Sequence, residues 1–255
     1  MVGIEPIAGA PAARVDLPDE RLLVLADYHA GFEAAARAKR GIELPSRATN
    51  RRERVLELVS QTDADRLVVL GDLTHRIGEP GTAERGELEL LVEALDRPIV
   101  VAKGNHDGVL EELLATDTAL FGDVTVLPAT GARLGPLGVV HGHTWPDPSV
   151  IDAPIVCMGH EHPCVRLADE VGGSRVERVW LRGPLDRTAF REHLDDVPME
   201  GESELVVFPA FNELCGGTWV NVPEQGFLAP FLPAALPEAR AYLLDGTDLG
   251  PYRRL

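Results

Sequence analysis

The sequence has few lysines and no long apolar run, and both absences exclude classes of function. Only Lys39 and Lys103 are lysines among 24 Lys+Arg, which face 41 Asp+Glu for a formal net charge of −17. So acidic a chain argues against broad, non-specific binding to nucleic acid, although one local basic groove is compatible with it. No apolar stretch approaches the ~20 residues of a membrane-spanning helix, so we expect no membrane partner.

Cysteine is also scarce. The three cysteines, Cys157, Cys164 and Cys215, show no CxxC spacing, and the N-terminus lacks the basic start and apolar run of a secretory signal. We therefore expect small buried thiols and a reducing, cytoplasmic location. The length of 255 residues suits one large domain, and no linker divides it, so we predict a single domain over 1–255. None of these features indicates an oligomeric state.

Short apolar runs alternate with helical patterns in the first two-thirds of the chain. The apolar runs predict buried strands over 21–26, 66–70 and 98–102, and helical spacing predicts helices over 47–60, 84–95 and 109–115. This alternation is typical of an α/β sheet with helices on its faces.

From about residue 124 short strands dominate the pattern. They are predicted over 137–141, 153–158, 164–170, 175–181 and 204–208, with a hairpin turn at Gly172–Gly173 and a helix over 185–194. The second half therefore predicts a more antiparallel sheet that faces the first. The apolar segment 227–237 is broken by prolines, and we expect it to be a packed or interfacial loop.

Polar clusters follow five of the apolar runs, where a ligand site in an α/β sheet is expected. The clusters are Asp27-Tyr28-His29, Gly71-Asp72-Leu73-Thr74-His75, Gly104-Asn105-His106-Asp107, His141-Gly142-His143 and Gly159-His160-Glu161-His162. Carboxylates and imidazoles together suit divalent ions such as Mn, Fe, Zn or Co. Satisfied loop histidines and helix N-caps are the alternative, but they do not account for five clusters in this order. The eighth histidine, His193, lies in a charged segment and is expected at the surface.

The series DxH, GDxxH, GNHD, HGH and GHxH over 27–162 is similar to that of the calcineurin-like metallophosphoesterase superfamily. The segment LVVFPAFNELCGG, which ends at Gly217, narrows the resemblance to a subgroup of predicted phosphoesterases that includes a ligase-associated DNA end-processing enzyme. The resemblance implies an α/β fold, namely a four-layer α/β/β/α sandwich of two mixed β-sheets flanked by helices.

The resemblance also implies two divalent metal ions and their ligands. Mn is favoured, with Fe, Zn, Co or Ni as alternatives. The first ion would be held by Asp27, His29 and His162, the second by Asn105, His141 and His160, and Asp72 would bridge the two.

Other residues of the motifs would meet substrate or position the residues that do. His106 corresponds to the family's general acid, and Asp107 would orient His106 or its loop. His75 and His143 are candidates for contact with substrate, with simple packing as the alternative for His75. Arg76 is a candidate for contact with phosphate, as are Arg47 and Arg51, although a solvated surface position is favoured for all three arginines.

The function implied is hydrolysis of a phosphoester substrate by attack of a metal-bridging hydroxide. The favoured hypothesis is a phosphodiesterase or nuclease that acts on DNA or RNA ends. The alternative is a small-molecule phosphatase or nucleotide hydrolase. A non-catalytic interaction protein on the same fold would have eroded ligands, whereas every expected ligand and His106 are present here.

Overall fold

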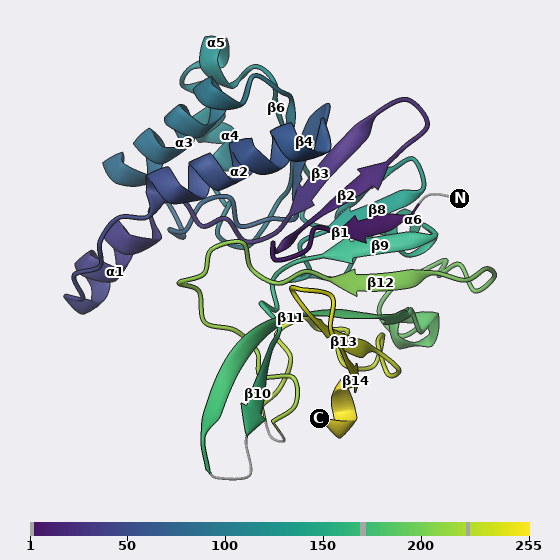
Figure 1. Ribbon diagram of the computed structural model, residues 1–255. Coiled ribbons are helices and arrows are strands. Elements are labelled where there is room, and N and C mark those ends of the chain that lie inside the picture. Colours follow the sequence, from purple (N-terminus) through teal and green to yellow (C-terminus); the bar gives the residue numbers. More distant parts are fainter. Residues whose placement is uncertain (1–2, 169–171, 223–224) are drawn as a thin grey trace.

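The computed structural model describes residues 3–168, 172–222 and 225–255, and it shows two β-sheets packed face to face (Figure 1). The first sheet is formed by β1 (Ile4–Pro6), β2 (Ala12–Asp16), β3 (Arg21–Leu25), β4 (Arg66–Val69), β5 (Ile99–Ala102) and β6 (Val124–Leu127), in that order. Strands β3 to β6 run parallel, because helical crossovers join them, and β1 and β2 add an antiparallel edge.

The second sheet is mixed and more antiparallel, as predicted. It comprises β7 (Ala132–Leu134), β8 (Leu137–Val140), β9 (Ile155–Met158), β10 (Cys164–Ala168), β11 (Ser174–Pro184), β12 (Glu204–Val207), β13 (Arg240–Leu243) and β14 (Asp248–Pro251). Its order is β14-β13-β11-β12-β9-β8-β7, with β10 paired to β11. Only the β8–β9 and β9–β12 pairs are parallel among the described strands of this sheet.

Helices cover the outer faces of both sheets. On the first sheet lie α2 (Ala48–Thr62), α3 (Thr82–Leu95), α4 (Leu110–Ala115) and α5 (Thr118–Phe121), while α1 (Phe32–Arg40) projects beyond them (Figure 1). The second sheet has short helices, α6 (Pro148–Ile151), η1 (Arg187–Phe190) and η2 (Tyr252–Arg254). The predicted four-layer α/β/β/α sandwich is therefore confirmed, with a thinner fourth layer.

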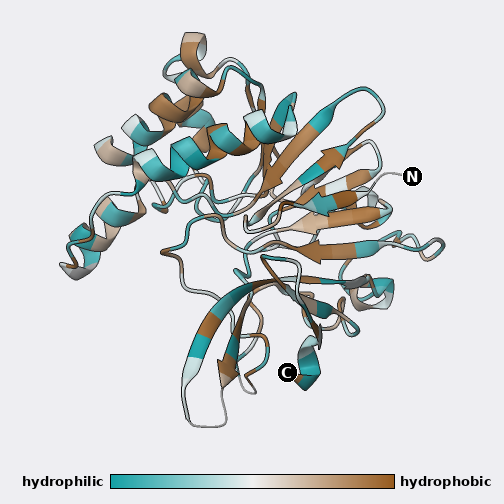
Figure 2. Ribbon diagram, viewed as in Figure 1, coloured by the Kyte–Doolittle hydropathy of each residue, from teal (hydrophilic) through white to brown (hydrophobic). Residues whose placement is uncertain are grey.

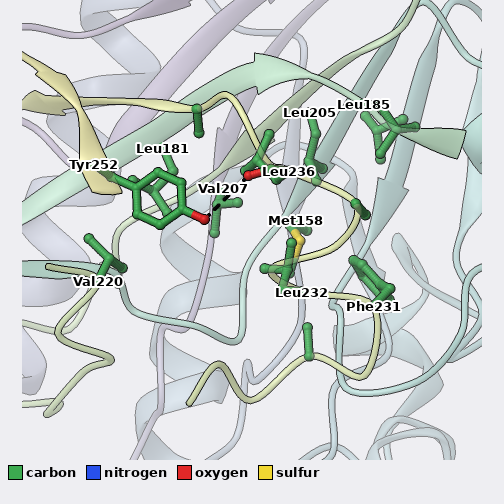
Figure 3. Close-up of a cluster of buried hydrophobic side chains, with 14 of the residues drawn as sticks. Met158, Leu181, Leu185, Leu205, Val207, Val220, Phe231, Leu232, Leu236 and Tyr252 are labelled. Atoms are coloured by element: carbon green, nitrogen blue, oxygen red, sulfur yellow. Dashed lines mark hydrogen bonds between the residues drawn. The ribbon is translucent and has the colours of Figure 1, made fainter. Parts of the chain in front are cut away.

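Three apolar clusters fill the spaces between these layers. One lies between the sheets and includes Val24, Val68 and Trp180; a second lies under α2 and α3. The third packs on the outer face of the second sheet, where the Tyr252 hydroxyl donates to the carbonyl of Leu236 (Figure 3). The strands that line these clusters are the most continuously apolar segments of the chain (Figure 2). The segment 227–237 belongs to the third cluster, so it is a packed loop.

The helix predicted over 185–194 is wrong, because only the short 3₁₀ helix η1 forms there. The Arg187 side chain is buried, and its guanidinium donates to the carbonyls of Pro198 and Glu200 and to Ser203 Oγ. These tertiary contacts override the local helix propensity. The other predicted elements end within a few residues of the observed ones. Asp169 and Glu170, the last residues of the strand predicted over 164–170, lie outside the described residues.

No helix in the described ranges is both long and apolar enough to span a bilayer.

Candidate metal centre

The carboxyl ends of β3, β4, β5, β8 and β9 meet at one edge of the two packed sheets (Figure 1). Each predicted ligand cluster directly follows one of these strands. The structure therefore brings residues far apart in the sequence into one buried polar centre, whose predicted ligands are Asp27, His29, Asp72, Asn105, His141, His160 and His162.

The first group of predicted ligands surrounds Asp27. His162 Nε2 lies 3.1 Å from Asp27 Oδ1, and His29 Nε2 lies 3.7 Å from Asp72 Oδ2. Asp27, His29 and Asp72 each offer a ligand atom within 4.8 Å of the others, a spacing that suits one divalent cation.

The second group surrounds His141. Its Nε2 lies 3.1 Å from Asn105 Oδ1, 3.2 Å from His160 Nδ1 and 3.4 Å from Asp72 Oδ1. Asp72 thus turns Oδ2 toward the first group and Oδ1 toward the second, which is the placement that a shared ligand requires.

Two of the histidines are oriented by backbone carbonyls. His141 Nδ1–H donates to the carbonyl of Leu70, and His162 Nδ1–H donates to that of Gly216, both over 2.8 Å. Each ring therefore turns its Nε2 toward the centre, where the atom can bind a cation once it has lost its proton. His162 Nε2 is buried and has no hydrogen-bond partner among the described residues. It faces Asp27 Oδ1 at 3.1 Å, so a cation bound there would take the place of the proton of the ring.

The charges of the centre shift the pKa values of its members. Burial lowers the pKa of His141 and of His162, but the carboxylates of Asp72 and Asp27 more than offset it and raise both values to about 9. Conversely, burial raises the pKa of Asp27, and the two imidazoliums outweigh it and lower the value overall. Burial also lowers the pKa of His160 to about 4. Strong coupling of this kind is typical of functional sites.

The backbone of the centre is strained. Five of the seven predicted ligands have positive φ angles: Asp27 57°, His29 49°, Asp72 51°, His160 70° and His162 46°. Such left-handed conformations are uncommon outside glycine and persist only where the surroundings enforce them. These predicted ligands therefore lie in sharp turns that follow the ends of the strands.

Two glycines allow these turns to approach each other. A Cβ on Gly104 would lie 2.2 Å from Asp72 Oδ1, and one on Gly71 would lie 2.3 Å from His141 Nδ1. Any larger residue at either position would displace a predicted ligand.

His106 lies at the edge of this centre and is partly exposed. Its Nε2 is 3.9 Å from Asp72 Oδ2, its ring Nδ1 contacts the carbonyl of His75, and its backbone N–H donates to Asp72 Oδ1 over 2.9 Å. Asp107 is fully buried and accepts from the backbone N–H of Thr74 and of Gly104. The Asp107 carboxylate therefore fixes the loop that carries His106. A catalytic role for Asp107 stays a prediction.

The three candidates for substrate contact lie in different surroundings. His75 Nδ1 is 3.3 Å from His29 Nδ1, and burial, together with the neighbouring His106 and Lys39, lowers the pKa of His75 to about 4. The His143 ring is 5.3 Å from that of His141, and its buried Nδ1 has no partner within the described part of the chain. The exposed Arg76 extends its guanidinium beside Gly81, at the start of α3.

The segment 211–217 closes the centre, and its contacts were not predicted. The backbone N–H of Asn212 donates to the carbonyl of Asp27 over 3.2 Å, and its side-chain amide donates to that of His29 over 3.4 Å. The Cys215 thiol lies within 4.8 Å of ligand atoms of His29 and His162.

Glu161, between two predicted ligands, points the opposite way. Its buried carboxylate accepts from Thr218 Oγ1 and from the backbone N–H of Leu228 and Ala229. It therefore ties the loop that carries His160 and His162 to the segment that follows the closing one.

The surface position expected for Arg51 is wrong, and its contact with phosphate stays a prediction. Its side chain is 6% exposed and donates to both oxygens of Glu33 and both oxygens of Glu87 over 2.8–3.0 Å. Glu87 also accepts from the backbone N–H of Gly31, two residues after His29. We call Arg51, Glu33 and Glu87 the Arg51 cluster; it joins α1, α2 and α3 beside the centre. Arg47, by contrast, is half exposed and pairs with Glu213.

Comparisons with known proteins agree with this architecture. A family model described as calcineurin-like phosphoesterase matches residues 20–164. The crystal structure of Pseudomonas putida nuclease MPE is similar to this chain at 19% sequence identity and a TM-score of 0.54, covering 95% of this chain and 98% of that one. Yfce, a phosphoesterase from E. coli, is 24% identical at a TM-score of 0.36, over 58% of this chain and 73% of that one. No curated protein matches the chain.

Proposed function

This chain belongs to the calcineurin-like phosphoesterase family and is a metal-dependent hydrolase; from that premise we propose that it holds two divalent ions and cleaves phosphodiesters at nucleic-acid ends. The observation that carries the two-ion proposal is the position of Asp72, with one oxygen toward each group of histidines. When bound, two ions supply the charge that activates water and offsets negative charge on the phosphoryl group.

The residues proposed to hold the ions offer only oxygen and nitrogen. Asp27, His29 and His162 would serve one ion, Asn105, His141 and His160 the other, and Asp72 both. Carboxylates, an amide and imidazoles suit Mn, and Fe, Zn, Co or Ni remain outcomes of the test below. The unpartnered His162 Nε2 supports this donor set.

His106 is proposed to act as the general acid. Its ring is partly exposed, so a bound phosphoester can reach it, and its loop is fixed by the buried Asp107. Donation of its proton would neutralise the leaving oxygen, a step that supplies typically about 10²–10⁴-fold in rate.

A panel of metals against substrates tests the proposal. The substrates are bis-p-nitrophenyl phosphate as a diester, p-nitrophenyl phosphate as a monoester, nucleotides, and end-labelled single- and double-stranded DNA and RNA. We expect hydrolysis of the diester and the nucleic acids, highest with Mn. Cleavage of nucleotides alone would replace the nuclease proposal by the small-molecule one, and no hydrolysis with any metal would overturn both.

His106→Gln tests the acid. We expect kcat to fall by about 10²–10⁴-fold while two ions still bind, because the side chain is proposed to touch substrate instead of metal. His193→Gln is the matched control, since His193 is exposed and stacks on Trp145 outside the centre. Full activity of His106→Gln would overturn the assignment.

A cytoplasmic location is also part of the proposal. It is supported by the three cysteines, all of which are free thiols in the structure.

A further inference from the structure

A cavity of 670 Å³ is lined by His106 and His75, next to the predicted metal ligands. We call it the α1 cavity, because α1 forms one wall. The segment after α1 and the closing segment complete it, and the side chains that matter here are Phe32, Ala36, Lys39, Leu214, His75 and His106.

We propose that the α1 cavity binds the leaving group of the substrate, and that this leaving group is a nucleotide, with an aromatic ring and one phosphate. The inference rests on the proposed phosphodiesterase function and names the part of the substrate that this chain selects.

The position of His106 locates the leaving oxygen of the substrate. Its Nε2 faces Asp72 at 3.9 Å, while its ring also lines the cavity. A general acid must lie within hydrogen-bond reach of the oxygen that it protonates. The leaving oxygen therefore sits at the inner end of the α1 cavity, and the group attached to it extends into that cavity.

The walls of the α1 cavity are aromatic and apolar. The Phe32 and His75 rings meet at 4.8 Å between centroids, and His75 stacks on His106 at 5.3 Å. Ala36 and Leu214 add apolar surface without hydrogen-bonding side chains. Aromatic faces with apolar neighbours suit a planar base, and the volume is in the range of small-molecule sites.

Lys39 provides a positive charge on the wall of the α1 cavity. Of the two lysines in this acidic chain, Lys103 pairs with Glu111, whereas the exposed Lys39 has no ion pair among the described side chains. A free ammonium on the cavity wall attracts a phosphate group. One ammonium matches one phosphate, so a single nucleotide fits better than a long, multiply charged strand.

Equilibrium binding tests the inference without catalysis. Titration calorimetry with thymidine 3′-monophosphate, whose free 5′-hydroxyl corresponds to the leaving oxygen, is done on the protein in EDTA to avoid capture of the phosphate by metal. We expect Phe32→Ala to weaken binding at least about fivefold by loss of stacking, and Lys39→Gln to weaken it about two- to fivefold. Ala36→Leu, which fills the cavity and keeps the helix, should also weaken it.

Arg37→Gln is the matched control, because Arg37 is on the same helix but pairs with Glu43 outside the cavity. Its affinity should equal that of the unaltered protein. Equal affinity of all four variants, or no binding to the unaltered protein, would overturn the inference.

A kinetic comparison separates this inference from the proposed function. With Mn, the dinucleotide thymidylyl-thymidine 3′-phosphate, whose leaving group is thymidine 3′-monophosphate, is compared with thymidine 3′-methyl phosphate, whose leaving group is methanol. We expect the unaltered protein to prefer the dinucleotide in kcat/KM, and Phe32→Ala to lose that preference. Equal rates on both would overturn the cavity inference alone. Hydrolysis of neither would overturn the proposed function, and the binding measurement would still decide the cavity.

Discussion

Two buried groups of charged residues lie side by side in this molecule and are built in opposite ways. In the Arg51 cluster, the guanidinium donates to all four carboxylate oxygens of Glu33 and Glu87. In the metal centre, Asp27 and Asp72 face imidazoles, and His162 Nε2 makes no hydrogen bond within the described residues. The first group is fully hydrogen-bonded, whereas the second contains a buried ring nitrogen without a hydrogen bond.

The difference shows which buried charges serve structure and which await a ligand. A fully hydrogen-bonded ion cluster is self-sufficient, although removing one member leaves an uncompensated charge. A buried polar atom without a hydrogen bond is costly, and a bound ligand can satisfy it. Four predictions follow this contrast, from the largest expected effect to the smallest.

Asp72→Asn should break the metal centre. We expect kcat/KM for bis-p-nitrophenyl phosphate to fall at least about 10³-fold, because the metals contribute several kcal/mol of transition-state stabilisation. Bound metal, measured by mass spectrometry, should fall below two ions per chain. Asp152→Asn, at an exposed carboxylate paired with Arg133, should change neither quantity. Full metal content in Asp72→Asn would contradict its role as the shared ligand.

Arg51→Met should break the complete cluster. It leaves two buried carboxylates without their cation, so we expect a loss of about 3–5 kcal/mol in the free energy of unfolding, measured with urea. Arg54→Met is the control on the same helix, where an exposed pair with Glu57 should cost less than about 1 kcal/mol. Similar losses for both variants would show that the Arg51 cluster is not special.

Added Mn should stabilise the metal centre and leave the Arg51 cluster as it is. At a hundredfold excess over its dissociation constant, a ligand of the folded state adds about 2.7 kcal/mol to the free energy of unfolding. The unaltered protein and Arg51→Met should both gain this increment, and Asp72→Asn should not. A gain in Asp72→Asn equal to that of the unaltered protein would place the ion elsewhere.

Acid should weaken the Arg51 cluster by the smallest amount. Burial raises the pKa of Glu33, but the hydrogen bonds from Arg51 outweigh it and keep the value below the ordinary 4.5. A depressed folded pKa stabilises the protein above the unfolded pKa, and this contribution is lost as pH falls through the folded value.

The measurement is the free energy of unfolding in EDTA between pH 6 and pH 3. Glu33→Gln should show a shallower slope, by up to one proton or about 1.4 kcal/mol per pH unit. Identical slopes would mean that Glu33 titrates normally in the folded protein.

Sequence reasoning recovered the central strands β3, β4 and β5 of the first sheet because they are apolar on both faces. The runs at β3, β4 and β5 are nearly wholly buried, so no pattern but a covered strand explains them. The strands at or next to the sheet edges were missed, since they are short and most carry polar residues: β1, β2, β6, β7, β13 and β14. The failed helix over 185–194 depended on the burial of Arg187 against residues more than ten positions away.

In the candidate site, too, residues with a local sequence signal were identified and residues defined by distant contacts were missed. Asp27, Asp72 and His141 were identified because each stands just after an apolar run, a signal that is local in the sequence. Gly216 supplies only a backbone carbonyl, which no side-chain pattern reveals. Arg51 looked like a surface residue because its partners Glu33 and Glu87 lie 18 and 36 positions away.

The closing segment also has a consequence for how the protein is made. The Gly216 carbonyl, which accepts from His162 Nδ1–H, lies 54 residues later in the chain. Asn212, which donates to the carbonyl of His29, lies 183 residues after His29. During synthesis the N-terminal part emerges first, and contacts of such high sequence separation form late. A nascent chain that already displays all seven predicted ligands would still lack the contacts that orient them. Metal loading is therefore expected to follow the docking of the closing segment 211–217, so a chain without that segment should bind metal poorly.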